Sequence, residues 1–521
     1  MGMTTSPSDP GPPVRGLTYT MATILSVLTI LLGYAVLDVA DAAPGVLTLT
    51  AAPPPAPTET PGTRTLPVVP QPTPSTSVGE PLPPLAGDAE APTADGVARA
   101  LRPVVARPAL ADSALVVRDG QTGEVLFDAG GSELRIPAST TKLLSAAAVG
   151  QAFAPDATLQ TVVQRGAADD EIVLVAGGDS LINPGKGDPE AVAGRAGLSD
   201  LSDQVTAALK KAGVRAVTLR VDESYAYGPG VAPTWDPSFR PSGITGAVAM
   251  LGLSSQRATG GRVGPADPVA AVRDLFVRQL ERRGIDVTLA PRDTPSVTAP
   301  TAPTGTAGTT GTATPATPTT APTTTTTTPP ATGPGSVLGR IVSAPVRDQL
   351  ALALTDSDNA LTEILARQAS FRSGGGTTFA DTGAWVVSQV AALGLDTTGV
   401  VLRDASGLSR ENRVRADLLT RILVLGYDGK HAVLRRALDG LPIGGLTGTL
   451  DDRFTGADSD AAGRARAKTG TLTGANALAG SVVDDDGRLL VFAGMVAGAG
   501  TTEARAALDR FVATLAACGC R

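Results

Sequence analysis

The chain has 521 residues, of which 42% are hydrophobic but only 3% aromatic, so its core must consist chiefly of Ala, Val and Leu. Its formal net charge of −7 argues against a general nucleic-acid-binding protein, because such proteins present a basic face. A single histidine, His431, excludes a zinc site built from several histidines, and two cysteines, Cys518 and Cys520, cannot form a four-cysteine metal centre.

An uncharged apolar segment occupies residues 17–37 near the N-terminus. Its 21 residues are enough to span a bilayer as a helix and exceed the roughly 7–15 of a signal-peptide core. Arg15 before it favours a cytoplasmic N-terminus. We therefore expect residues 1–43 to be a cytoplasmic stub and membrane anchor, or else a signal peptide cleaved near residues 40–42. Either alternative places the rest of the chain outside the cytoplasm, anchored to the cell membrane or secreted.

Two segments rich in Pro and Thr interrupt the sequence. Residues 44–94 are typical of an extended linker. Residues 292–335 lie between structured segments and are interpreted as an insertion in a surface loop, which costs little closure entropy. We expect a catalytic domain at residues 95–165 and 340–521, with one or more inserted domains at residues 166–339.

The remaining sequence predicts a mixture of strands and helices. Alternating apolar residues around a Gly-Gln-Thr-Gly turn predict a hairpin at residues 114–128. Helical spacing predicts helices at residues 139–153, 201–211, 269–284 and 359–370. Near the C-terminus the sequence predicts a strand at residues 464–469, a hairpin at 477–496 and an amphipathic helix at 502–517. Cys518 and Cys520 then either form a tight disulfide outside the cytoplasm or remain thiols.

Ser139-Thr-Thr-Lys142 places a hydroxyl and an amine three residues apart at the start of a predicted helix. On a helix these two positions share one face. A lysine whose pKa is lowered by burial or by a nearby cation can activate a serine nucleophile. The chain has only six lysines, so a lysine at a motif position is informative. Taken alone, however, the tetrad is also typical of a capped helix with a solvated lysine.

Two further motifs follow, Ser357-Asp-Asn before a predicted helix and Lys468-Thr-Gly-Thr on a predicted strand. Taken singly, the first is typical of a helix N-cap and the second of an edge strand with a protective lysine. Together and in this order, the three motifs match the set shared by penicillin-binding proteins and class A β-lactamases.

The spacing narrows the resemblance, since 218 residues separate Ser139 from Ser357 and 111 separate Ser357 from Lys468. The first interval is far longer than in class A β-lactamases, and no Glu-x-x-Leu-Asn loop follows the second motif. The chain resembles the class C low-molecular-mass penicillin-binding proteins, which are serine-type D-alanyl-D-alanine carboxypeptidases/endopeptidases. Asp404-Ala-Ser-Gly-Leu-Ser-Arg and Leu441-Pro-Ile-Gly-Gly are similar to two more stretches of that family, with Ala replacing a usual Gly in the first.

The resemblance covers about residues 95–521, apart from the Thr/Pro insertion. It implies an α+β, penicillin-binding/β-lactamase-like transpeptidase fold: an antiparallel sheet flanked by helices, with smaller domains inserted between the first two motifs. It also implies hydrolysis of peptidoglycan stem peptides through an acyl-serine, covalent inhibition by β-lactam antibiotics, and no metal or other cofactor. A β-lactamase and a catalytically silent peptidoglycan-binding or β-lactam-sensing module are the alternatives.

Residue by residue, the resemblance implies three catalytic side chains. Ser139 would attack the carbonyl of the penultimate D-Ala, Lys142 would take its proton, and Ser357 would relay a proton toward the leaving amine. The backbone N–H groups of Ser139 and Thr471 would form the oxyanion hole, which contributes about 3 kcal/mol per donor.

Four further residues are implied to bind substrate. Asn359 would hold the substrate amide and orient Lys142. Lys468 would attract the terminal carboxylate through its positive charge, and its charge would help to keep Lys142 neutral. Thr469 and Thr471 would donate hydrogen bonds to the same carboxylate, or to the matching group of a β-lactam.

Overall fold

The computed structural model describes residues 15–39, 89–293, 295 and 333–521, within two compact units, Met1–Leu82 and Pro83–Arg521. The described part of the first unit is a single helix, α1 (Arg15–Val39), which contains the predicted anchor. Among the residues that the structure describes, no helix is both long and apolar enough to cross a membrane. The predicted linker lies outside the described residues as far as residue 88.

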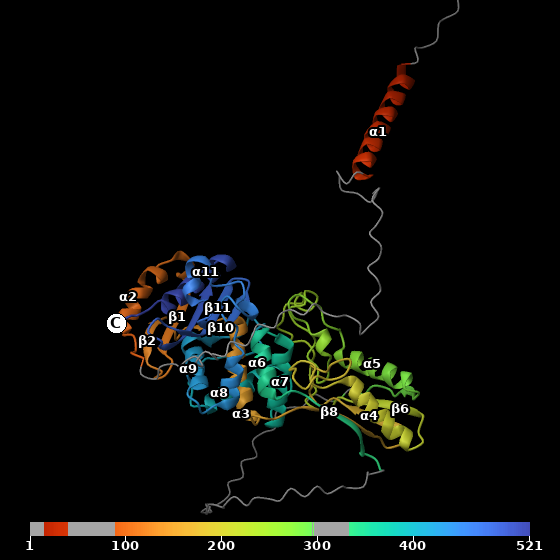
Figure 1. The fold of residues 1–521 in the computed structure, drawn as a ribbon. Coiled ribbons are helices and arrows are strands. Elements are labelled where there is room, and N and C mark those ends of the chain that lie inside the picture. The colour runs from red at the N-terminus through yellow and green to blue at the C-terminus, as the bar shows by residue number, and fades with distance from the viewer. Residues whose placement is uncertain (1–14, 40–88, 294, 296–332) are drawn as a thin grey trace, which may run out of the picture. The chain divides into compact units, whose positions relative to one another are not determined.

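One antiparallel sheet of the second unit joins the two ends of the folded chain (Figure 1). Its order is β10-β11-β12-β1-β2, so β1 pairs with β12 and β10 is one of the two edge strands. The strands are β1 (Ser113–Asp119), β2 (Val125–Ala129), β10 (Ala465–Leu472), β11 (Ala475–Val483) and β12 (Leu489–Ala497). The helices α2 (Ala94–Val105) and α11 (Thr501–Ala516) share a core with this sheet. A disulfide joins Cys518 to Cys520 after α11.

A group of helices shares a core with the same sheet and surrounds α3. They are α3 (Thr141–Ala152), α6 (Val346–Thr355), α7 (Asn359–Arg372), α8 (Phe379–Ala392), α9 (Ala416–Tyr427) and α10 (Ala432–Asp439). Every residue from Thr141 to Val149 is buried, because small alanines let neighbouring helices approach α3 from all sides. A short ladder of β3 (Leu134–Arg135) and β9 (Val414–Arg415) precedes this group.

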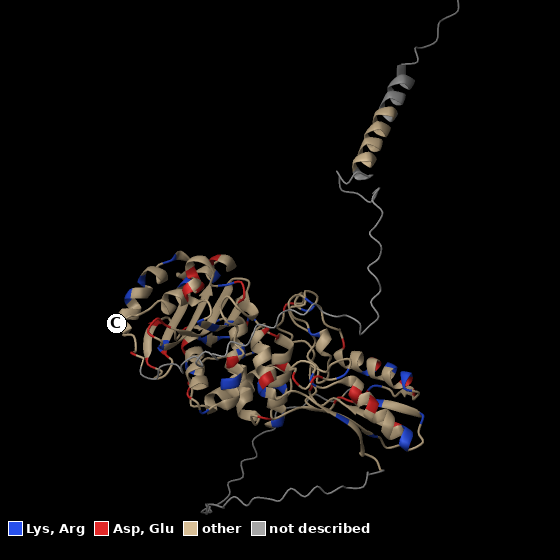
Figure 2. Ribbon diagram, viewed as in Figure 1, with Lys and Arg blue, Asp and Glu red and all other residues tan. Residues whose placement is uncertain are grey.

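A second sheet, of order β7-β6-β5-β4-β8, is parallel between β5, β6 and β7 and antiparallel elsewhere. Its strands are β4 (Gln160–Arg165), β5 (Glu171–Val175), β6 (Ala216–Asp222), β7 (Asp286–Leu289) and β8 (Val337–Val342). The helices α4 (Leu198–Lys211) and α5 (Pro268–Arg282) are the crossovers that parallel pairing requires. In Figure 2 basic and acidic residues lie intermixed along both sheets and their helices.

The second sheet lies largely within the predicted inserted domain, residues 166–339, but extends beyond it at both ends. That range leaves β4 out and cuts β8, although both strands pair within this sheet. We therefore propose residues 159–343 as the inserted domain. Arg292, the first residue of the predicted low-complexity loop, forms ion pairs with Glu223 and Asp267.

Candidate active site

Ser139 and Lys142 lie together where the chain turns into α3. Ser139 is in a 3-10 turn, η2 (Ala138–Thr140), so α3 begins two residues later than the predicted helix. The Lys142 Nζ donates to Ser139 Oγ over 3.1 Å. Ala138 has a φ of 47°, a left-handed conformation that non-glycine residues adopt at a cost of about 1–3 kcal/mol and that clusters at functional sites.

The Lys142 amine is fully enclosed. It donates to Asn359 Oδ1 over 2.6 Å and to the Ser406 carbonyl over 2.8 Å. Burial lowers the pKa of Lys142 to about 8, against the opposing influence of the Asp404, Glu363 and Asp358 carboxylates. A substantial fraction of Lys142 is therefore neutral near physiological pH, and only the neutral amine can accept a proton from Ser139.

The second motif lies at the start of α7. Ser357 has a φ of 54°, so its backbone is also left-handed. The Asp358 carboxylate caps α7 by accepting the Leu361 N–H over 3.0 Å. Asn359 accepts from Lys142 and donates its Nδ2 to the Ile244 carbonyl over 2.7 Å, so one amide connects the base to the inserted domain.

Arg257 holds this motif from the inserted domain. Its Nε donates to Asp358 Oδ2 over 2.9 Å, and its Nη2 donates to Asp356 Oδ2 over 2.9 Å. The two carboxylates flank Ser357 on both sides in the sequence. Arg257 therefore fixes the strained segment that presents the Ser357 hydroxyl.

The third motif lies on the edge strand β10, beside the Ser139 turn. A Cβ added at Gly470 would lie 2.8 Å from the Pro137 carbonyl oxygen, so only glycine permits this approach. Lys468 is fully buried, which is inconsistent with a protective lysine on the surface. Its Nζ donates to the Thr469 carbonyl over 3.0 Å, and burial, followed by the charge of Lys142, lowers its pKa well below the ordinary value.

The two threonines of this motif lie nearer the solvent. The Thr469 hydroxyl shares a 2.8 Å hydrogen bond with the Thr449 hydroxyl. Thr471 is exposed, and its hydroxyl accepts from Arg505 over 3.4 Å. Both hydroxyls are thus on the accessible side of the strand, whereas Lys468 is enclosed.

Two buried carboxylates that act on Lys142, Glu363 and Asp404, were not among the predicted site residues. Glu363 accepts the N–H groups of Ala405 and Ser406 over 3.0 and 2.7 Å, and burial, then Asp404, raise its pKa to about 7. Asp404 accepts the indole N–H of Trp235 over 2.7 Å. The sequence contained a signal for Glu363, since Asn359 and Glu363 are four residues apart on the predicted helix.

Within the described ranges, no three His, Cys, Asp or Glu side chains cluster as a metal site would require.

The chain is similar to known proteins over most of its length. The model of the D-Ala-D-Ala carboxypeptidase 3 (S13) family matches residues 97–266 and 319–518. The carboxypeptidase DacB of Mycolicibacterium smegmatis is 34% identical over 84% of this chain and 87% of its own. The D-alanyl-D-alanine carboxypeptidase of Actinomadura sp. (strain R39) is 28% identical over 73% of this chain and 77% of its own. Penicillin binding protein 4 of Haemophilus influenzae, at 18% identity, superimposes with a TM-score of 0.56 over 81% of this chain and 98% of its own, which confirms the predicted fold.

Proposed function

Because the chain belongs to the D-Ala-D-Ala carboxypeptidase 3 (S13) family, we propose that Ser139 is the nucleophile of a serine-type carboxypeptidase and Lys142 its base. The resemblance predicted from the three motifs is confirmed, and the chain is a D-alanyl-D-alanine carboxypeptidase that acts on peptidoglycan stem peptides. The observation that carries the residue assignment is the 3.1 Å contact between the Lys142 amine and the Ser139 hydroxyl.

Acylation begins when Ser139 Oγ attacks the carbonyl carbon of the penultimate D-Ala. The hydroxyl proton passes to the neutral Lys142 amine, and the carbonyl π electrons move onto the oxygen. The backbone N–H groups of Ser139 and Thr471 stabilise this oxyanion. The tetrahedral intermediate then collapses, breaking the C–N bond to the terminal D-Ala.

The leaving amine needs a proton as the C–N bond breaks. Ser357 relays one from protonated Lys142, and Asn359 holds the substrate amide. The left-handed backbone of Ser357 and the ion pairs of Arg257 support this assignment, because they hold the Ser357 backbone in place independently of substrate. Water then hydrolyses the acyl-enzyme and regenerates Ser139.

The terminal carboxylate binds along β10. Lys468 is buried without a carboxylate partner among the described residues, so a bound carboxylate would raise its pKa and stabilise its protonated form. The exposed Thr471 and half-buried Thr469 hydroxyls donate to the same group. A β-lactam carries a carboxylate in a similar place, and we propose that it acylates Ser139 and inhibits the enzyme.

A fluorescent penicillin tests this function, with mass spectrometry of the labelled Ser139 peptide. A long-lived label on Ser139 supports the carboxypeptidase; a label lost within seconds indicates a β-lactamase, and no label indicates a silent module. Incubation with defined muropeptides then compares released D-Ala with cleaved cross-links. We propose that the enzyme also has endopeptidase activity, and the second product measures it.

We propose that residues 17–37 anchor the enzyme to the cell membrane, with the catalytic unit outside the cytoplasm. The support is the uncharged 21-residue segment and Arg15 before it. Cell fractionation with N-terminal sequencing of the mature protein tests this. A new N-terminus after residues 40–42 would show a cleaved signal peptide and a secreted enzyme instead.

A further inference from the structure

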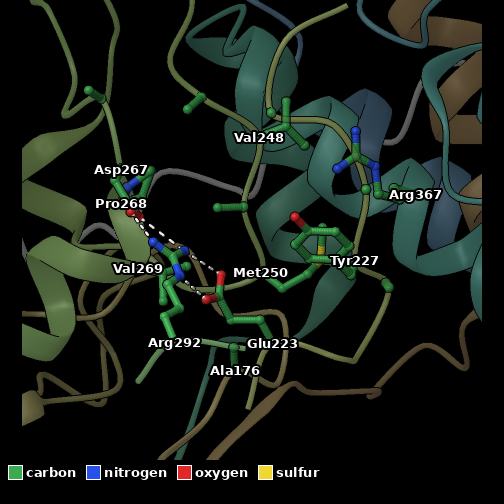
Figure 3. Close-up of a pocket in the computed structure, with 16 residues that line it drawn as sticks. Ala176, Glu223, Tyr227, Val248, Met250, Asp267, Pro268, Val269, Arg292 and Arg367 are labelled. Carbon is green, nitrogen blue, oxygen red and sulfur yellow. Dashed lines mark hydrogen bonds and ion pairs between the residues drawn. The ribbon is translucent and has the colours of Figure 1, made fainter. Parts of the chain in front are cut away.

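A cavity of about 220 Å³ opens in the proposed inserted domain (Figure 3). Its lining contains no residue of the three motifs. Its wall includes residues from the segments 226–230 and 247–250. Residues 266–269, where α5 begins, and Arg367 of α7 also line it. Sites for drug-sized ligands measure roughly 300–1,000 Å³, so this cavity is suited to a smaller molecule.

Arg367 supplies the positive charge of this cavity. It lies on α7 two turns after Asn359 and is only 2% exposed. Its Nη2 donates to the Pro229 carbonyl over 2.7 Å, and its guanidinium lies 4.8 Å from the centre of the Phe379 ring. In the described ranges no carboxylate lies within ion-pair distance of it. Glu363, one turn earlier on α7, attracts the guanidinium without contacting it. A ligand carboxylate in contact with the remaining N–H donors would further offset the cost of burying this charge.

The opposite part of the wall carries excess negative charge. Arg292 donates to both oxygens of Glu223, over 2.6 and 2.8 Å, and also pairs with Asp267. Two carboxylates thus share one guanidinium. Figure 3 shows this group on one side of the cavity and Arg367 on another, with the Tyr227 hydroxyl pointing toward the space between them. None of the described residues is a hydrogen-bond partner of that hydroxyl.

The backbone around the cavity is shaped for a close approach to Arg367. A Cβ added at Gly228 would lie 3.2 Å from the Arg367 Cζ and 2.3 Å from the Thr377 carbonyl oxygen. Ala226, two residues earlier, has a φ of 48°. Strained backbone of this kind clusters at ligand sites, where the surrounding structure maintains it.

We propose that this cavity binds a short peptide or amino acid with both ends free, its carboxylate on Arg367 and its ammonium group toward Glu223 and Asp267. A guanidinium pairs with a carboxylate through two parallel N–H···O bonds, which gives both strength and orientation. The excess carboxylate on the opposite wall selects a cation at the other end. This site is separate from Ser139, and the inference does not depend on the proposed function.

Gly230 offers a way to fill the cavity without disturbing its wall. Its φ is not left-handed, and an added Cβ would meet only the Val248 carbonyl oxygen at 3.7 Å and the Ala247 Cβ at 3.8 Å. Gly230→Leu therefore projects a side chain into the cavity. Gly185→Leu is the matched control, because its added Cβ would meet only the Asn183 side chain at 3.5 Å, outside the cavity.

The test measures binding of D-alanyl-D-alanine by calorimetry to the full-length Ser139→Ala protein, which cannot consume the dipeptide; the cavity variants separate binding in the cavity from binding at the three motifs. N-acetyl-D-alanyl-D-alanine lacks the ammonium group, and D-alanyl-D-alaninamide lacks the carboxylate. We expect both to bind at least tenfold more weakly than the dipeptide. Arg367→Gln and Gly230→Leu should each weaken dipeptide binding at least tenfold, whereas Gly185→Leu should not.

Two results would overturn the proposal: equal binding of the dipeptide and its two blocked forms, or unchanged dipeptide binding by Gly230→Leu. If Arg367→Gln fails to fold, the Gly230 and Gly185 variants still decide the question. The penicillin labelling of the wild-type enzyme reports on Ser139 separately, so failure at one site is distinguishable from failure at the other.

Discussion

Arg257 donates a 2.9 Å hydrogen bond to Asp358, the residue between Ser357 and Asn359 in the second motif. Arg257 lies within residues 159–343, the proposed inserted domain, whereas the motif lies at the start of α7. The Ile244 carbonyl, also from the inserted domain, accepts from Asn359. Residues of the proposed inserted domain thus hold two residues of the second motif in place.

Arg257→Gln should slow acylation by penicillin about 10- to 100-fold, because small displacements of a positioned group cost rates of this size. The buried Asp358 carboxylate loses its charged partner, which should lower the free energy of unfolding by about 1–3 kcal/mol. Stopped-flow acylation and thermal unfolding measure the two effects. Arg262→Gln is the control, because Arg262 lies on the same loop and makes only a 3.5 Å contact with the Ser255 carbonyl. Equal acylation rates in Arg257→Gln and Arg262→Gln would show that Arg257 does not position Ser357.

Ser139→Ala should abolish covalent penicillin labelling while leaving the melting temperature within a few degrees of the wild type. The hydroxyl is half-buried and its contact is with the Lys142 amine, so its loss leaves the surrounding helices intact. Mass spectrometry of the intact protein measures the label. Ser132→Ala, at an exposed serine of the same segment, should label normally. A label retained by Ser139→Ala would contradict the assignment of the nucleophile.

The acylation rate should increase with pH and level off above a midpoint near 8. Below that pH Lys142 is protonated and cannot accept the Ser139 proton, so the rate should fall about tenfold per pH unit. Penicillin carries a permanently ionised carboxylate over this range, so the enzyme accounts for the profile. The second-order acylation rate constant between pH 5.5 and 9.5 measures the midpoint. A flat profile would mean that Lys142 is not the base.

Glu363→Gln should shift that midpoint to lower pH, by up to about one unit. The Glu363 carboxylate raises the pKa of Lys142, and it is mostly ionised at pH 8 because its own pKa is about 7. A glutamine carbonyl can still accept the Ala405 and Ser406 N–H groups, so the local structure should persist. Glu171→Gln, in the inserted domain, removes a carboxylate that pairs with Arg220 and should leave the midpoint unchanged. A shift to higher pH would show that this electrostatic explanation is wrong.

Replacement of residues 296–332 by a short Gly-Ser linker should leave acylation within about twofold of the wild type, because loop length costs little closure entropy. Extending the deletion back to residue 292 should lower the melting temperature, since Glu223 and Asp267 then lose their shared guanidinium. Thermal unfolding of the two deletions compares these effects. A collapse of soluble expression with the shorter deletion would show that the segment is structural.

The sequence predicted several elements within a few residues of their observed bounds, including α7, which is buried over most of its length. The hairpin of β1 and β2, the helices α4 and α5, and the C-terminal strands with α11 lie close to their predicted ranges. No prediction covered α8, α9 or α10. Gly383 in α8 and Gly426 in α9 disfavour a helix by intrinsic propensity, yet a Cβ there would come within 2.4 Å of the Leu402 oxygen and 2.1 Å of the Leu438 Cδ1. Close packing, which no local pattern reveals, requires glycine in both helices.

The sequence alone determined the chemistry available to this protein. With one histidine and six lysines in the chain, the three motifs indicated a serine nucleophile with a lysine base, and they named both residues and their family. Only the tertiary structure decided the protonation of that lysine, since its pKa depends on enclosure by α7 and on Glu363 and Asp404, more than 200 residues away in the chain. Desolvation and charge act through space, so they become defined only when the distant segments pack together.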